Sequence, residues 1–131
     1  MSLSILAAAL LAQSPPASGA AQWEAFGPAQ PGMTNEVDSA SIARTGERVS
    51  LRMRTVRASP APDGTTSAIS AFTIDCRART AQLDGVDFYG ADGAPGRSLS
   101  GEDAVPISNR DPMQRALFER ACRAPAAAPA S

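Results

Sequence analysis

The sequence predicts an α+β domain, in which an antiparallel β-sheet of five to six strands carries one C-terminal helix. Three observations support this prediction. Several stretches alternate apolar and polar residues, as half-buried strands do. One capped, amphipathic segment lies near the end of the chain. The chain has two cysteines, one in an alternating stretch and one in the amphipathic segment, and a bond between them would join the helix to the sheet.

The composition excludes several classes of function. The chain has 131 residues, the length of one domain, and 12 basic residues balance 13 acidic ones. This balance gives no electrostatic footprint for nucleic acid, which requires a basic patch or stripe that dominates the surface. Because His and Lys are both absent, Ser-His-Asp and Cys-His catalysis, Schiff bases and a phosphate-binding P-loop lysine are excluded. Carboxylates and Tyr89 remain as acid–base candidates.

The first residues predict an export signal. Leu3–Ala12 is an apolar run of about half the length that a membrane span needs. It fits the hydrophobic region of a secretory signal, although no Lys or Arg precedes it. The alternative is a buried apolar helix. Small residues at Ser18–Ala20 favour cleavage after Ala20 or Ala21, so residues 1–21 are assigned to the signal. The mature protein is then expected to be periplasmic or secreted, with no membrane anchor.

The first half of the mature chain predicts three strands, at Trp23–Phe26, Asn35–Ile42 and Val49–Arg57. The third alternates most clearly: Leu51 and Met53 face one side, and Arg52 and Arg54 face the other. This pattern is typical of an antiparallel sheet with one solvated face. Trp23 is interpreted as a residue that packs in the core or at the sheet edge, and an exposed stacking role is the alternative.

The strand on which the prediction depends runs from about Ala68 to Arg79, and its alternating apolar face ends in Cys76. Ala81–Tyr89 is its predicted hairpin partner. The apolar phase changes at Gly85, which predicts a β-bulge. A last short strand is expected near the end of the sheet, over residues 97–100.

Ser108–Arg123 predicts the helix. Asp111 is a suitable N-cap, Pro112 suits the first helical position, and Gln114 completes a capping box. An isolated helix of this length is marginal in water, so it is expected to dock on the sheet. Its docking side comprises Met113, Gln114, Leu117, Phe118, Ala121 and Cys122. The Pro- and Ala-rich residues 124–131 are predicted to be a disordered tail.

The cysteines Cys76 and Cys122 are interpreted as one disulfide, as suits an exported protein. Closing such a loop is worth up to about 4 kcal/mol. The alternative is a reactive thiol pair, which the wide spacing disfavours because redox pairs commonly have the Cys-x-x-Cys spacing. Two thiols without His leave a tetrahedral metal site incomplete. No metal and no other cofactor is predicted.

Charged residues provide two candidate sites. Four arginines are expected on the polar side of neighbouring strands, where they would form a face for an anionic partner: Arg52, Arg54, Arg77 and Arg79. The alternative is a solvated face on which nearby acids neutralise the arginines. Asp84 and Asp87 would suit a catalytic carboxylate pair, and the alternative assigns them to turns or strand edges.

The order of short motifs along the chain is informative. The motifs are Asp38-x-x-Ser41-Ile42 before a Gly46 turn, Asp75-Cys76-Arg77, Phe88-Tyr89-Gly90 followed by Asp92-Gly93, and a short helix that ends in Cys122. From about Trp23 to Arg123, this order resembles the surface-adhesin protein E family of bacterial envelope proteins. The resemblance implies an antiparallel sheet tied to a C-terminal helix by a disulfide, at the two cysteine positions already paired above.

The resemblance also bears on function. The family's namesake is an adhesin that binds host extracellular-matrix and serum proteins, but this sequence lacks the lipid-anchor cysteine and lysine-rich binding segments. For residues 22–123 we expect a non-enzymatic, exported envelope protein that binds a protein partner, in the manner of an adhesin. The alternatives are a periplasmic structural or inhibitory protein and a carboxylate-based hydrolase.

Overall fold

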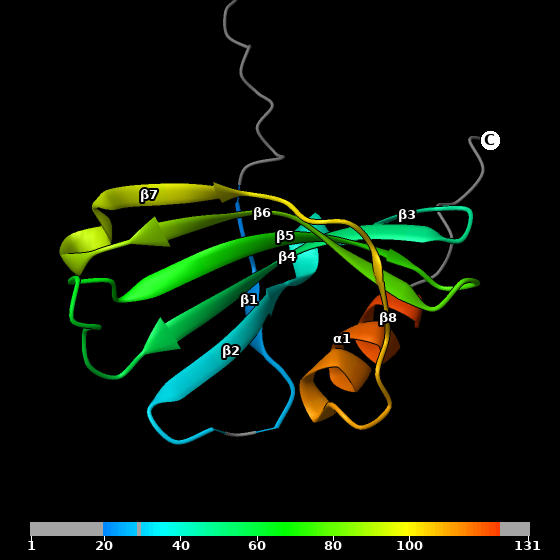
Figure 1. Cartoon of the computed structure of the whole chain (residues 1–131), viewed down its shortest axis with the longest axis horizontal. Helices are drawn as coiled ribbons and strands as arrows, with labels where there is room; N and C mark the ends of the chain where they lie inside the picture. Colours follow the sequence, from blue (N-terminus) through cyan, green and yellow to red (C-terminus); the bar gives the residue numbers. More distant parts are fainter. Residues whose placement is uncertain (1–19, 29, 124–131) are drawn as a thin grey trace, which may run out of the picture.

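The structure is a computed structural model that describes residues 20–28 and 30–123. The predicted disordered tail lies outside the described residues, and so does all but the last part of the predicted signal peptide. The described chain forms an antiparallel sheet with one α-helix, α1 (Pro112–Cys122), near its C-terminal end (Figure 1). The predicted α+β class is therefore confirmed.

The sheet is built on a path of six strands in the order β1-β2-β4-β5-β6-β7. These are β1 (Trp23–Ala25), β2 (Met33–Asp38), β4 (Arg48–Arg57), β5 (Ser67–Asp75), β6 (Thr80–Tyr89) and β7 (Pro95–Ser100). Two short strands lie off the path: β3 (Ala43–Thr45) pairs with β4, and β8 (Val105–Pro106) pairs with β6. Neither β3 nor β8 was predicted, because neither segment shows an alternation of apolar and polar residues.

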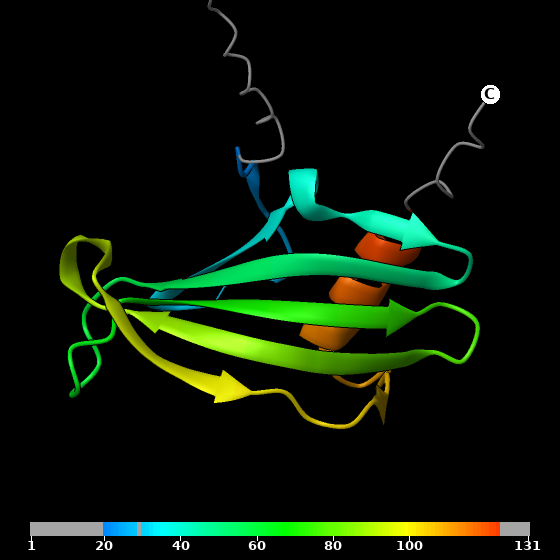
Figure 2. The ribbon, with the colours of Figure 1, turned by 90° about the horizontal axis from the view of Figure 1, so that it is seen from above.

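The helix covers one face of the sheet and only part of its length. Figures 1 and 2 show α1 beneath the half of the sheet that contains the β3–β4 and β5–β6 turns. The core lies between this half and the helix, as the alternation predicts. Its buried apolar residues come from four strands and the helix: Val37, Val49, Leu51, Ile74, Ala81, Leu117 and Ala121.

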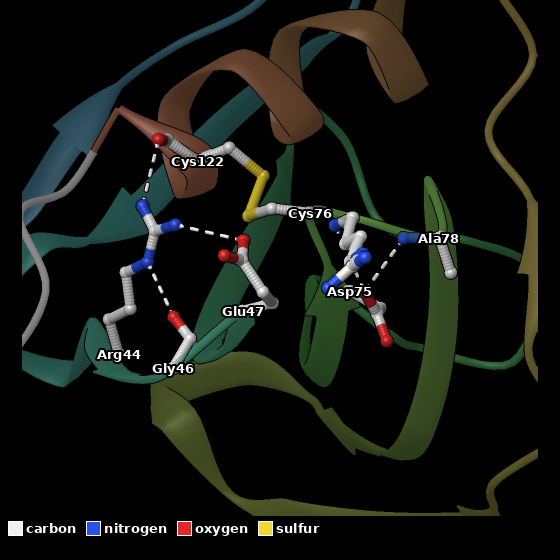
Figure 3. Close-up of a disulfide and its surroundings, with 8 residues drawn as sticks. Arg44, Gly46, Glu47, Asp75, Cys76, Ala78 and Cys122 are labelled. Atoms are coloured by element: carbon white, nitrogen blue, oxygen red, sulfur yellow. Dashed lines mark hydrogen bonds and ion pairs between the residues drawn. A yellow bond between two sulfur atoms is a disulfide. The ribbon is translucent and has the colours of Figure 1, made fainter.

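A disulfide joins Cys76 to Cys122, with the two Cα atoms 5.7 Å apart, so the predicted bridge is confirmed. Cys122 is the last residue of α1, and Cys76 directly follows β5. The β3–β4 hairpin supports the bridge, as Figure 3 shows. The Arg44 guanidinium donates to the Cys122 carbonyl (3.1 Å) and forms an ion pair with Glu47 (3.2 Å). The helix is thus held to two neighbouring hairpins at one end of the sheet.

The predicted strand from Ala68 to Arg79 is too long at its C-terminal end, because β5 ends at Asp75. The Asp75 carboxylate accepts hydrogen bonds from the Arg77 N–H (3.0 Å) and the Ala78 N–H (2.8 Å). Arg79 has a left-handed backbone, with a φ of 58°. A side-chain-capped turn therefore replaces the last residues of the alternating stretch.

The start of α1 confirms two predictions and corrects a third. Pro112 is the first helical residue, and Asp111 Oδ1 accepts hydrogen bonds from the Met113 and Gln114 N–H groups. The capping box, however, is wrong in its second half. Gln114 Oε1 accepts from the Ser108 N–H (2.8 Å), while the Asp111 N–H donates to the Ser108 carbonyl (3.3 Å). Residues 108–111 form a turn that leads into the helix.

The predicted bulge in β6 is confirmed. Ala71 pairs with Gly85 and Phe72 pairs with Leu83, which leaves Asp84 as the extra residue. The bulge changes the apolar phase of the strand. It also places the Asp84 carboxylate where it accepts a hydrogen bond from the Thr73 hydroxyl (2.7 Å).

Candidate partner-binding face

The candidate site is the face of the sheet opposite α1, which we call the open face. No helix or strand of the described chain covers it (Figures 1 and 2). Strand alternation puts the polar sides of β2 and β4 on this face. In the sheet register, Trp23 lies opposite Asp38, and Glu36 lies opposite Arg54. We call the residues gathered at this point the arginine cluster: Trp23, Glu36, Asp38, Arg52 and Arg54.

Two guanidinium groups lie over one indole ring in the arginine cluster, one close to it and one further away. Arg54 Cζ lies 4.4 Å from the centroid of the Trp23 ring, and Arg52 Cζ lies 5.8 Å from it. Both distances are within the range of a cation–π contact. Trp23 is half-buried in β1, which is the edge strand of the sheet. This position agrees with the interpretation of Trp23 as a residue that packs at the sheet edge. The Trp23 ring is also shared by the two arginines, of which Arg54 is the closer.

Each arginine is held in place by one carboxylate. Arg54 Nε donates to Glu36 Oε1 at 2.8 Å, and Arg52 Nη2 donates to Asp38 Oδ2 at 2.6 Å. The two acids neutralise the two guanidinium charges, so the arginine cluster has no net charge. The contacts fix the orientation of both planar groups, which restricts side chains that are otherwise flexible.

Asp38 is the buried member of the cluster, with only 1% of its surface exposed. Burial raises its pKa, but hydrogen bonds from the Gln22 N–H, the Arg52 guanidinium and the Ala40 N–H outweigh burial and hold the pKa below its usual range. The carboxylate is therefore charged at neutral pH, and it anchors Arg52 from beneath.

A shallow hollow of about 200 Å³ lies beside the arginine cluster. Ala71 and Gly85, which follow Arg52 across the sheet, leave room because their side chains are small or absent. Asp84 and Asp87 also line the hollow. Asp84 is hydrogen-bonded to Thr73 as described above, and Asp87 accepts a hydrogen bond from the Ser98 hydroxyl (2.6 Å). Each acid therefore has a partner on a neighbouring strand.

The structure brings two of the four predicted arginines together and places the other two elsewhere. Arg77 and Arg79 lie in the β5–β6 turn, and both are exposed. The Arg79 guanidinium lies over Phe118 of α1, 4.3 Å from the ring centroid, and donates to Asn109 Oδ1 at 3.2 Å. Arg79 thus belongs to the helix side of the molecule, whereas Arg52 and Arg54 belong to the open face.

Sequence reasoning named the arginines of the cluster but missed Glu36 and Asp38. The available signal was the alternation of two acids around one apolar residue, Val37, which is fully buried. That pattern puts both acids on the face away from the core. It does not say that β2 lies beside β4, which is what pairs them with the arginines.

The described residues hold neither a cluster of metal ligands nor a membrane-spanning helix. Within 20–28 and 30–123, no three or more His, Cys, Asp or Glu side chains gather in a way that would hold a metal ion. No helix in the same part of the chain has both the length and the apolar character needed to cross a membrane.

Comparison with known proteins gives two findings. Over residues 23–123, the chain matches the family described as surface-adhesin protein E. The fold is similar to that of protein E from Haemophilus influenzae (crystal form II), with a TM-score of 0.50 and 13% sequence identity over 73% of this chain and 91% of that chain. At this identity, the structural likeness shows the fold alone. No match was found among curated proteins.

Proposed function

The chain belongs to the surface-adhesin protein E family, and on this premise we propose that it is a non-enzymatic, exported envelope protein that binds a protein partner. Membership of this family supports the proposal that the chain is a bacterial surface protein with an adhesin-like role. We further propose that the partner binds the open face of the sheet. The observation that supports this choice is the pair of cation–π contacts that Arg54 (4.4 Å) and Arg52 (5.8 Å) make with Trp23, which we call the stack.

The residue types of the arginine cluster suit a protein interface. Trp and Arg are the residues that most often contribute a large share of binding free energy, and they do so near the centre of an interface. In this cluster, Glu36 and Asp38 hold both guanidinium groups in place before a partner arrives. Less side-chain entropy is then lost on binding, which favours affinity.

The charges of the open face also limit the choice of partner. Because the arginine cluster is neutral and Asp84 and Asp87 line the hollow beside it, a strongly anionic partner gains little from this face. We propose a partner surface of near-neutral charge that offers an aromatic or amide plane to the stack. A small apolar side chain would occupy the hollow.

The proposal is tested by binding of the purified protein to a panel of purified extracellular-matrix and serum proteins. The variant Arg52→Ala/Arg54→Ala is expected to lose at least about tenfold in affinity for whichever protein binds, the effect typical of an interface centre. The matched control is Arg77→Ala/Arg79→Ala, which removes the same charge from the β5–β6 turn. Equal losses in the two variants would contradict the proposed face.

Melting temperatures and a second variant separate a loss of binding from a loss of folding. Removing Arg52 leaves the buried Asp38 without its ion pair, so the melting temperature of each variant is measured first. Trp23→Leu keeps all four charges of the cluster and removes only the ring on which the arginines stack. It too is expected to weaken binding, and unchanged binding of a folded Trp23→Leu protein would argue against the stack as the contact.

Location tests the adhesin role separately. We expect the protein to be accessible to an added protease on intact cells. Recovery only from the periplasmic fraction would contradict the adhesin role and favour a periplasmic structural or inhibitory protein.

A further inference from the structure

The helix is too short to cover the whole face of the sheet on which it packs, which we call the inner face. At 11 residues, α1 is about 16 Å long, whereas the ten-residue strands β4 and β6 each extend over about 33 Å. Figure 1 shows the helix under one half of the sheet, and the β4–β5 loop and η4 (Ala91–Gly93) at the opposite end. A hollow of about 240 Å³ lies at this end.

The floor of this hollow is mostly apolar. Thr55, Ala68 and Phe88 lie side by side on β4, β5 and β6. They share the face that packs on α1 further along the same strands. Met33 of β2 also lines the hollow, and 39% of its surface is exposed. An apolar floor without a covering element is typical of a small-molecule site when polar groups converge on its rim.

Two arginines and one acid form the charged part of the lining. The Arg97 guanidinium lies over Phe88, 4.7 Å from the ring centroid. Its ion pair with Asp63 is long, at 4.0 Å, and both side chains are more than half exposed, so the pair is weak. Arg57 donates to the Ser59 carbonyl (3.1 Å) and has no carboxylate within ion-pair distance among the described residues. The hollow therefore has one positive charge in excess.

We propose that this hollow binds a small carboxylate with a short apolar tail. The carboxylate would accept hydrogen bonds from Arg57 and Arg97, since a planar guanidinium matches the geometry of a carboxylate. The tail would lie on Met33 and Phe88, which removes their apolar surface from water. The site is on the opposite face from the arginine cluster, so this proposal is independent of the proposed partner-binding role.

The first experiment compares hexanoate with hexanol by titration of the folded protein, followed by NMR. Hexanoate is expected to cause saturable shifts of the amide signals of Thr55, Ala68 and Phe88. Hexanol has a similar tail but no charge, and we expect it to bind at least about fivefold more weakly. Equal affinities, shifts spread over other parts of the sheet, or no saturable shift would each overturn the proposal.

Single substitutions test the two arginines. Arg57→Gln and Arg97→Gln are each expected to weaken hexanoate binding by roughly two- to fivefold, the range for an exposed ion pair. The matched control is Arg48→Gln, because Arg48 is exposed at the opposite end of β4. The control is expected to bind hexanoate as the parent does. If either arginine variant behaves like the control, that arginine does not contact the carboxylate.

A substitution of Asp63 is expected to strengthen hexanoate binding, whereas the arginine substitutions are expected to weaken it. Its carboxylate accepts a hydrogen bond from the Thr65 N–H (3.0 Å). This bond, with the Thr65 hydroxyl and Arg97, holds the pKa of Asp63 below its usual range, so the group is charged at neutral pH. Asp63→Asn keeps an acceptor for Thr65 and removes the charge that competes for Arg97. Hexanoate is expected to bind more tightly to this variant, and unchanged or weaker binding would contradict the assigned role of Arg97.

Discussion

At the scale of single residues, Asp38 shows how a buried charge is tolerated at the end of an inner strand, β2. Three donors converge on its carboxylate, from the Gln22 N–H, the Ala40 N–H and the Arg52 guanidinium. A buried charge is costly unless it is paired and hydrogen-bonded, and Asp38 meets both conditions. Through these contacts it joins the chain before β1 to the start of η3 (Ser39–Ser41) and to β4.

The lowered pKa of Asp38 predicts how stability responds to acid. A carboxylate whose folded pKa lies below its unfolded value stabilises the protein above about pH 4, and this contribution is lost as the pH falls through the folded pKa. Asp38→Asn is therefore expected to be less stable than the parent at pH 7 and to lose less stability on acidification. The measurement is the urea midpoint at about pH 7 and about pH 3.

The control for this prediction is Asp103→Asn, at an exposed position after β7. It is expected to follow the parent at both pH values. A parent and an Asp38→Asn variant that lose equal stability between the two conditions would show that the carboxylate makes no special contribution.

At the scale of elements, α1 is held at both ends by different means. Asp111 caps its N-terminus, and the disulfide fixes its last residue to the end of β5. Between these ends, the helix buries few side chains fully, namely Leu117 and Ala121. A short helix with so small a buried stripe depends on tertiary contacts, so the covalent bond is expected to contribute much of its docking.

Removal of the disulfide tests this dependence. The cysteines are 46 residues apart, and opening such a loop costs up to about 4 kcal/mol through the added entropy of the unfolded chain. Cys122→Ser is expected to lower the melting temperature by at least several degrees. Cys76→Ser and the parent in reducing agent should melt at the same lowered temperature. A variant that melts like the parent would show that the bridge contributes little to stability.

At the scale of the whole molecule, the sheet separates two candidate sites. The arginine cluster lies on the open face, and the hollow proposed to bind a carboxylate lies on the inner face beyond the end of the helix. The two sites share no lining residue. They also lie at different positions along β4, because Arg52 is central whereas Arg57 is the last residue of the strand.

This separation predicts that the sites act independently. Arg52→Ala/Arg54→Ala is expected to leave hexanoate binding unchanged, and Arg57→Gln/Arg97→Gln is expected to leave partner binding unchanged. Saturating hexanoate should not alter the partner's affinity. Two titrations, each with and without the other ligand, measure the coupling directly. A change of more than about twofold in either affinity would show that the sheet couples its two faces.

Local patterns in the sequence were enough to predict most elements. Alternation around Leu51 and Arg52 predicted both a strand and the direction of its side chains, because the period of a strand is a property of the backbone. The phase change at Gly85 predicted the bulge, and Asp111 followed by Pro112 predicted the start of the helix. Each of these signals lies within a few residues of the feature that it predicts.

What the sequence by itself determined is therefore the set of long elements, their buried sides and the pairing of the only two cysteines. Only the tertiary structure decided that Glu36 and Asp38 lie against Arg54 and Arg52, that Arg79 turns toward the helix, and that α1 leaves part of the inner face open. The physical reason is that strand order, register and the overlap of helix with sheet depend on contacts between residues far apart in the chain. A periodic pattern predicts which side of a strand is buried, but it does not predict which other strand lies beside it.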